Sequence, residues 1–212
     1  MVTRVGNRPI PDDDTAGVAP ARTSAIMGEL RRQRQAVAGD RGPEPWVLRR
    51  DEAIVVAGFA AAVRGVMVAA AIDDDHHPGP VLRYAAAQAR RLGVPMRAVH
   101  VWTETLSPAA PCLRLRRHDR MSDADQLLAD VLYESLPQPE ADAAERQILH
   151  DPDPVRALAA LSADAALLVV GVRGEGTREG LLGGTVRRLV GRTACPLAVL
   201  PEPEDAVLKP TW

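Results

Sequence analysis

The stretch LLVVGVRGEGTREGLLGGT, residues 167–185, joins a short apolar run to a segment rich in glycine. The run ends at Gly171, and its composition is typical of a strand buried in a parallel sheet. The residues after Thr185 have the apolar spacing of a helix. The first N–H groups of a helix lack partners within it and can bind an anion. The stretch therefore predicts a strand, a glycine loop and a helix start suited to a phosphate, with a flexible connection as the alternative.

The same alternation continues on both sides of this stretch. Apolar runs predict five strands, at residues 66–72, 96–102, 145–150, 165–171 and 196–202. Helical spacing predicts four helices, at residues 79–93, 122–136, 153–162 and 185–193, with Ser122 as the N-cap of the second and Pro154 in the first position of the third. Each connection is long enough for a crossover, so we expect βαβ units. The fold expected is an α/β fold with a five-stranded parallel sheet and helices on both faces.

The beginning of the chain has a different composition. Residues 1–45 are rich in Pro, Asp and Arg and poor in large apolar groups, so we expect disorder there, with a short helix at 24–39. Residues 46–63 could form an added strand or an added helix, and their periodicity favours neither. The chain therefore divides into an extension at 1–63, a domain at 64–203 and a short tail at 204–212.

Composition excludes several classes of function. The net charge is −2, which offers no bulk attraction for nucleic acid. Lys209 is the only lysine, so no Walker-type P-loop is present. The apolar stretch 53–72 has the length of a membrane span, but Arg64 lies within it and alanine dominates it, so we expect no span. Without a secretory signal we expect a cytoplasmic protein whose two cysteines, Cys112 and Cys195, are free thiols.

Residues 167–201 resemble the C-terminal half of the universal stress protein family. The family signature is G-x2-G-x9-G-[ST], and this sequence matches it at Gly171, Gly174, Gly184 and Thr185. The segment RTACPLAVLP, 192–201, also resembles the family's A-x-C-P-V-x-V strand, and the similarity covers about residues 64–202. The resemblance implies a Rossmann-like domain of the adenine nucleotide alpha hydrolase-like type, usually dimeric, whose members with the signature bind ATP.

The resemblance also implies individual contacts to a nucleotide. Asp73, at the end of the first strand of the domain, takes the place of an aspartate that contacts the nucleoside. Val99 falls where the family offers backbone groups to adenine. Val186, directly after the Gly184–Thr185 pair, completes the implied cofactor-binding set. Arg187 and Arg188 could reach the phosphates, or they could form a solvated face of their helix.

One feature departs from the family pattern. Asp74 and Asp75 follow Asp73 where the family has Gly and Ser, and two unit charges about 4 Å apart repel by roughly 1–4 kcal/mol near a surface. Either a divalent cation such as Mg²⁺ bridges these acids to the phosphates, or the side chains point away, or ATP binding is weakened. The run DDDHH, 73–77, could also suggest a transition-metal site, but adjacent residues rarely converge on one ion, so we expect no metal ligands.

The resemblance favours an ATP-binding stress-response or signalling module. No general base or catalytic lysine is recognisable, so we expect no catalytic residue and at most slow ATP hydrolysis. A second hypothesis is a nucleotide-free dimeric scaffold of the same family that acts through the N-terminal arm and the last strand, 196–202. The resemblance implies that this strand can pair across a homodimer, through an exposed edge. A third is an adenylyl-transfer enzyme of the wider group, for which the chain carries no recognisable motif.

Overall fold

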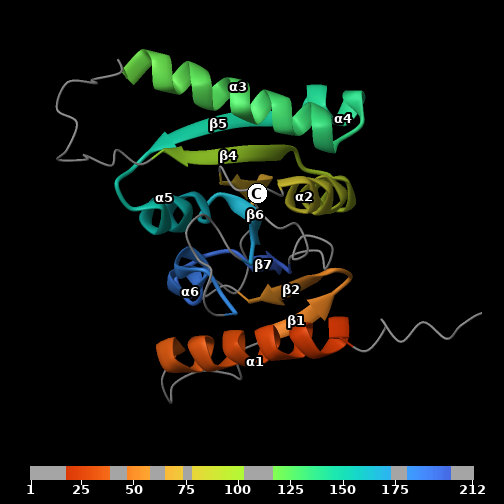
Figure 1. The fold of residues 1–212 in the computed structure, drawn as a ribbon, viewed down its shortest axis with the longest axis vertical. Coiled ribbons are helices and arrows are strands. Elements are labelled where there is room, and N and C mark those ends of the chain that lie inside the picture. The colour runs from red at the N-terminus through yellow and green to blue at the C-terminus, as the bar shows by residue number, and fades with distance from the viewer. Residues whose placement is uncertain are drawn as a thin grey trace, which may run out of the picture.

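The computed structural model describes residues 18–38, 47–57, 65–73, 78–102, 117–172 and 181–201. These residues form a single seven-stranded sheet with the order β1-β2-β7-β6-β3-β4-β5 (Figure 1). The strands are β1 Val47–Arg50, β2 Ala53–Val56, β3 Met67–Ile72, β4 Met96–Trp102, β5 Glu145–His150, β6 Ala165–Gly171 and β7 Leu197–Leu200. The five strands from β7 to β5 are parallel to one another, as the sequence predicts. The sheet has seven strands rather than five because the extension adds β1 and β2, which are antiparallel to their neighbours.

Helices cover both faces of the sheet (Figure 1). They are α1 Val18–Ala38, α2 Pro78–Leu92, α3 Arg117–Ser135, α4 Gln138–Ala143, α5 Pro154–Leu161 and α6 Gly184–Leu189. One hydrophobic cluster joins α2, α3 and α4 to one face, with Leu82 and Leu128 fully buried in it. A second cluster joins α1, α5 and α6 to the other face, with Leu30, Leu158 and Leu189 buried in it. The doubly covered parallel sheet confirms the predicted fold class.

The predicted elements of the domain are found, with differences at their ends. Strands 96–102, 145–150 and 165–171 have the predicted bounds, and Pro154 begins α5 with Asp153 as its N-cap. The predicted N-cap role of Ser122 is wrong, because α3 begins at Arg117 and Ser122 lies exposed inside it. Helix α4 was not predicted, because it is short and its proline obscures the helical spacing.

The extension is more ordered than its composition suggests. Residues 18–38 form α1, which includes most of the short helix considered for 24–39 and extends it into residues for which disorder was predicted, and Ile26 and Leu30 are at most 1% exposed. These two side chains are one helical turn apart, so they fix one face of the helix in the core, and Met27 packs against the same cluster. The following hairpin turns at Asp51 and Glu52, and Asp51 takes the left-handed conformation with φ of 54°.

The apolar stretch 53–72 is not a membrane span in this fold. Its first residues, 53–56, form β2, and its last residues, 67–72, form β3. Among the helices that the structure describes, none combines the length and the apolar character needed to cross a bilayer.

The last strand, β7, does not lie at an edge of the sheet. It pairs with β6 on one side and with β2 on the other. The exposed edge that dimerisation through residues 196–202 requires is therefore absent from the structure. The sequence could not reveal this, because the pairing partner comes from a segment, 46–63, whose periodicity favoured neither strand nor helix.

Candidate functional site

The neighbouring strands β3 and β6 separate before they end. They pair with each other as far as Ala70 and Val169. Beyond these residues, β3 continues to pair with β4 as far as Ile72, and β6 continues to pair with β7 as far as Gly171. The chain order of the sheet also reverses between β3 and β6. Ligands of open α/β sheets bind at such a switch point, beyond the carboxyl ends of the strands.

The glycine loop begins and ends at this same edge. Gly171 ends β6, and the N–H of Val172 donates to the carbonyl of Leu200 at 2.8 Å. The N–H of Gly183 then donates to the carbonyl of Val172 at 2.9 Å. This bond returns the chain to the end of β6, so α6 begins beside the switch point. Gly174 lies outside the described residues.

Helix α6 starts without a side-chain cap. Its N-cap is Gly183, with φ of −64° and ψ of 157°, and the first bond of the helix runs from the N–H of Arg187 to the carbonyl of Gly183 at 3.0 Å. Thr185 is half-buried in the helix and is not its N-cap, so its hydroxyl does not cap the helix start. Val186 is 3% exposed and packs in the core. Gly184 is exposed, and a Cβ at this position would meet no described atom within 4 Å.

Asp73 and Val99 lie at different depths. Asp73 directly follows β3 and is exposed at the carboxyl edge. Val99 is fully buried inside β4, where it is paired in register with Ala71 of β3 and Gln147 of β5. Val101 lies on the same face as Val99, two residues nearer the carboxyl edge, and is half-buried. Of the valines in β4, Val101 is therefore the one beside the switch point.

A buried histidine fixes the end of β3. His100 of β4 is 7% exposed, and its Nδ1 lies 3.1 Å from the carbonyl oxygen of Ile72. Because a carbonyl only accepts, Nδ1–H is the donor in this bond. The bond ties the residue directly before Asp73 to the neighbouring strand, so the edge beside the switch point is held by a side chain as well as by the ladder.

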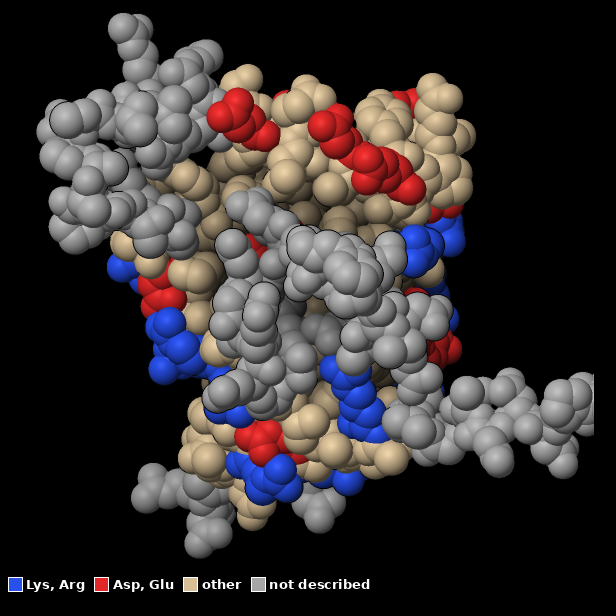
Figure 2. All heavy atoms as spheres, viewed as in Figure 1, with Lys and Arg blue, Asp and Glu red and all other residues tan. Residues whose placement is uncertain are grey.

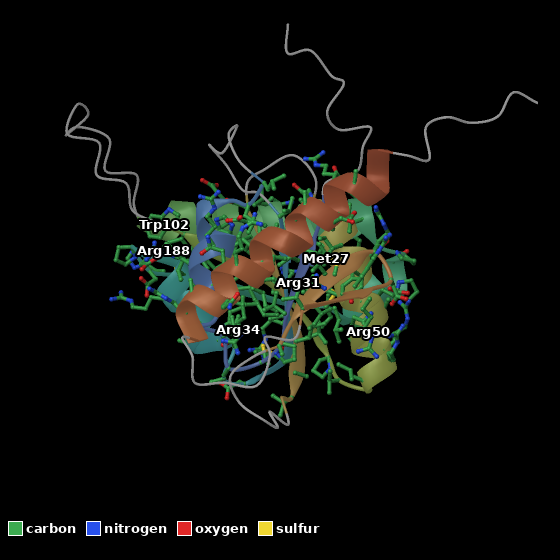
Figure 3. The ribbon with its side chains drawn as sticks, turned by 90° about the horizontal axis from the view of Figure 1, so that it is seen from below. Met27, Arg31, Arg34, Arg50, Trp102 and Arg188 are labelled. Carbon is green, nitrogen blue, oxygen red and sulfur yellow. The ribbon has the colours of Figure 1, made fainter. Side chains whose placement is uncertain are left out.

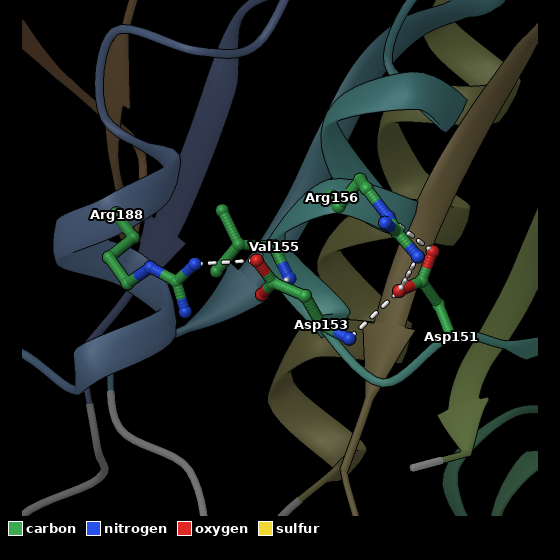
Figure 4. Close-up of polar contacts among 5 residues, drawn as sticks. All are labelled: Asp151, Asp153, Val155, Arg156 and Arg188. Atoms are coloured by element: carbon green, nitrogen blue, oxygen red, sulfur yellow. Dashed lines mark hydrogen bonds and ion pairs between the residues drawn. The ribbon is translucent and has the colours of Figure 1, made fainter.

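An ion-pair network joins the start of α5 to Arg188 in the last turn of α6 (Figure 4). Asp153 accepts from the N–H of Val155 at 3.1 Å, as the N-cap of α5, and from Nη2 of Arg188 at 2.6 Å. Asp151 accepts from the N–H of Asp153 at 2.8 Å and from two nitrogens of Arg156, both at 2.9 Å. The bond from Arg188 lowers the pKa of Asp153, and the bond from Arg156 lowers the pKa of Asp151.

Of the two arginines of α6, Arg188 thus has a partner of its own. Arg188 is bound to Asp153, and Arg187 is close enough to α1 for its charge to act on Glu29. The pKa of Glu29 is lowered chiefly by hydrogen bonds from Gln33 and Arg32, with Arg187 a smaller cause. Acidic side chains gather towards α3 in Figure 2, and arginines lie lower on the same face among further acids. The described part of this face therefore has no continuous basic patch of the kind that nucleic acid requires.

Comparisons with known proteins agree with this architecture. A model of the universal stress protein family matches residues 67–201. Among solved structures, a universal stress protein from Archaeoglobus fulgidus shares 22% identity over 64% of this chain and 93% of its own, with a TM-score of 0.48. A structure of the universal stress protein from the same organism in complex with dAMP shares 21% identity over 66% and 99% of the two chains, with a TM-score of 0.47.

The hypothetical protein MJ0577 has a TM-score of 0.52 to this chain, at 13% identity over 66% of this chain and 97% of its own. At such identity the likeness shows a shared fold. No curated protein matches the sequence. The family match begins at residue 67, so the extension with α1, β1 and β2 lies outside it.

Proposed function

The chain belongs to the universal stress protein family, and from that premise we propose that it binds an adenine nucleotide at the carboxyl edge between β3 and β6. The observation that carries the proposal is the separation of these strands beyond Ala70 and Val169, at the point where strand order reverses. The bond from Gly183 to Val172 supports it, because it brings the start of α6 to the same point. The nucleotide would lie across the ends of β3 and β6, with its phosphates at α6.

The phosphates would be held mainly by backbone. The N–H groups of Gly184, Thr185 and Val186 precede the first bond within α6, so they are available to an acceptor outside the helix. The Thr185 hydroxyl is not used as a cap and can donate to a phosphate oxygen. The open space over Gly184 lets a phosphate approach the backbone closely.

The nucleoside would be held at the ends of β3 and β4. The Asp73 carboxylate, exposed beside the switch point, can accept hydrogen bonds from ribose hydroxyls. We propose Val101 rather than Val99 as the residue of β4 that meets adenine. Val99 is paired in register with strands on both sides, whereas Val101 lies beyond the last pair of β3 with β4, which is Ile72 with His100.

The ligand proposed is ATP together with Mg²⁺. Asp73 begins a run of three acids, so a nucleotide bound nearby gains from a divalent cation that neutralises part of the phosphate charge. Backbone amides and one carboxylate can position such a ligand, but they supply no general base. We therefore propose a binding module that acts in stress response or signalling through its nucleotide state, with ATP turnover slow or absent.

The experiment is a binding measurement with a matched pair of glycine variants. Ligand carried through purification is released with acid and examined for adenine nucleotide, and ATP is then titrated with and without Mg²⁺. Gly184→Ala places a methyl group where none of the described atoms lies within 4 Å. It should leave the melting temperature close to that of the parent and weaken ATP binding at least about tenfold, a change of about 1.4 kcal/mol.

The control is Gly28→Ala in α1, where the added Cβ would make an ordinary contact, 3.7 Å from Nη1 of Arg32. This variant should bind ATP as the parent does. If the parent releases no nucleotide and binds no ATP with or without Mg²⁺, the proposal fails. The hypothesis of a nucleotide-free scaffold is then favoured. Unchanged ATP binding in Gly184→Ala would instead mean that the phosphates do not bind at the start of α6.

A further inference from the structure

Strand β3 loses one of its two neighbouring strands just before it ends. It pairs with β6 as far as Ala70, whereas its pairing with β4 continues to Ile72. Among the described strands, the last two residues of β3, Ala71 and Ile72, are therefore paired on the β4 side alone. A chain segment with fewer backbone partners opens more easily, so a bond from a side chain matters more at this strand end than in the middle of the sheet.

His100 supplies such a bond from β4. Its Nδ1–H donates to the carbonyl oxygen of Ile72 at 3.1 Å, and the residue is 7% exposed, so water competes little for the bond. The carbonyl group of Ile72 and the N–H group of Asp73 belong to the same planar peptide group. The bond therefore fixes the orientation of the plane through which the chain enters Asp73, and a turn of that plane would move the Asp73 side chain.

His100 acts from the face of the sheet opposite α6. Its partner in register, Ile72, and its neighbour on the same face of β4, Ala98, both pack in the cluster under α2 and α3, whereas α6 packs on the other face. Trp102, which ends β4, and Arg188 of α6 lie towards the same side of the molecule (Figure 3), so β4 ends at the edge where α6 lies. His100 is thus behind the proposed nucleotide, where its buried ring can act on Asp73 but not on the ligand itself.

We infer that His100 is a positioning residue, which holds the Asp73 carboxylate in line with a ribose hydroxyl and so makes the site selective for ribonucleotides over deoxyribonucleotides. The inference rests on the proposed function, in which Asp73 binds the ribose. A bond from a hydroxyl to a carboxylate forms only over about 2.5–3.0 Å, so a small shift of the strand end breaks it. Such a bond to a charged group contributes roughly tenfold or more to affinity, and a deoxyribonucleotide cannot form it.

The test measures the affinities of the full chain for ATP, 2′-deoxyATP and 3′-deoxyATP in the presence of Mg²⁺. The parent should bind ATP at least about tenfold more tightly than the analogue that lacks the hydroxyl bound by Asp73. His100→Leu fills the buried position with an apolar side chain and removes the donor to Ile72. Its affinity for ATP should fall to within about twofold of its affinity for the analogue, which should stay that of the parent. General damage to the site would weaken the binding of both ligands.

Three further variants separate positioning from a merely structural role. His100→Asn keeps a donor, because its amide nitrogen is bonded to Cγ as Nδ1 is, and should retain the selectivity for ATP. His150→Leu makes the same substitution at the end of β5, where the ring packs against Trp102 with centroids 4.5 Å apart, and should bind all three nucleotides as the parent does. In a chain that already carries Asp73→Ala, His100→Leu should change no affinity, since the group that it positions is absent.

The outcomes distinguish this inference from the proposed function. A parent that binds no nucleotide rejects both. A parent that binds ATP and both deoxy analogues equally keeps the proposed function and overturns the inference. Equal losses of affinity for ATP and for the analogue in His100→Leu would overturn it as well, because His100 would then act on the site as a whole. A further loss of affinity when His100→Leu is added to Asp73→Ala would have the same meaning.

If His100→Leu fails to fold, the parent and His100→Asn decide the question. Nuclear magnetic resonance of the nucleotide-free parent should show a proton on Nδ1 of His100, as the bond to Ile72 requires. A ring that carries no proton on Nδ1 would overturn the inference, and this measurement needs no variant. A His100→Asn chain that folds and binds ATP no more tightly than the deoxy analogues would overturn it too.

Discussion

Among single residues, the backbone positions of the candidate site follow from the sequence better than its side-chain contacts do. The sequence predicted a strand that ends at Gly171 and a helix that begins at Thr185; β6 ends at Gly171, and α6 begins one residue earlier than predicted, at Gly184. The partner of Arg188 could not be predicted, because Asp153 lies 35 residues earlier in the chain and reaches α6 only after α5 and α6 have packed together. The burial of Val99 could not be predicted for the same reason, because it depends on the strands that pair with β4 on both sides.

The ion pair of Arg188 with Asp153 should limit nucleotide affinity. Arg188 follows Gly184 by four residues, so the two lie on the same face of α6, and the arginine side chain leans towards the helix start. Asp153→Asn keeps an N-cap for α5 but loses the carboxylate, which frees Arg188 for the phosphates. Because an exposed ion pair contributes about 0.2–1 kcal/mol, ATP should bind roughly 1.4- to fivefold more tightly.

Isothermal titration with ATP measures this change. Asp151→Asn serves as the control, since Asp151 binds Arg156 and not Arg188, and its affinity should equal that of the parent. Equal affinity in the Asp153→Asn and Asp151→Asn variants would mean that Arg188 does not reach the nucleotide.

The hydroxyl of Tyr84 should contribute little to the stability of the protein. The residue is 3% exposed, and its hydroxyl is buried without a hydrogen-bond partner in the described structure. Burial is the main cause that raises its pKa. Tyr84→Phe removes the unpaired polar group and keeps the ring, so the free energy of unfolding should stay the same or rise by up to about 1 kcal/mol. Urea denaturation measures it, and a loss of stability would show that the hydroxyl has a partner.

Among the elements, α5 depends most clearly on one side chain. Asp153 caps its N-terminus and Pro154 sets its first turn, as the sequence indicated for the proline. Helix α6 has the opposite character, since a glycine begins it and no side chain caps it. Both helices start at the carboxyl edge of the sheet. The Asp153 carboxylate caps the start of α5, whereas the first N–H groups of α6 remain available to an acceptor outside the helix.

The cap of α5 should therefore be measurable in stability and in its dependence on pH. Asp153→Ala should lower the free energy of unfolding at neutral pH by about 0.5–2 kcal/mol. The folded-state pKa of Asp153 is lowered, with the bond from Arg188 as the first cause. The stabilising contribution is consequently present above the ordinary value of 3.8 and is lost as the pH falls through the folded-state pKa.

Urea denaturation at a series of pH values tests this, with Asp123→Ala on the exposed surface of α3 as the control. The difference between the parent and Asp153→Ala should shrink as the pH falls below about 4. A difference that stays constant into acid would assign the effect to packing rather than to the carboxylate.

In the whole molecule, the described part of the extension, residues 18–38 and 47–57, belongs to the folded core. Ile26, Leu30 and Val47 belong to the same hydrophobic cluster as Leu189 of α6 and Leu197 of β7. The average composition of residues 1–45 hid this, because burial depends on a few aliphatic side chains at the right spacing and not on the mean.

Leu30→Ala should accordingly destabilise the entire domain. Leu30 is fully buried, so its truncation should cost about 2–5 kcal/mol in a single unfolding transition. Val37→Ala is the control, because Val37 lies on the same helix at 52% exposure and should change the midpoint little. Circular dichroism during thermal unfolding measures both. A parent-like midpoint for Leu30→Ala would mean that α1 is not part of the cooperative unit.

Local patterns in the chain were enough to predict the parallel strands at 96–102, 145–150 and 165–171 and the fold class, because strand and helix periodicity are properties of neighbouring residues. The place of β2 beside β7, the parting of β3 from β6 and the bond between Arg188 and Asp153 emerged only in three dimensions. Each of these joins groups far apart in the sequence, and such pairings form only when long-range packing brings their partners together.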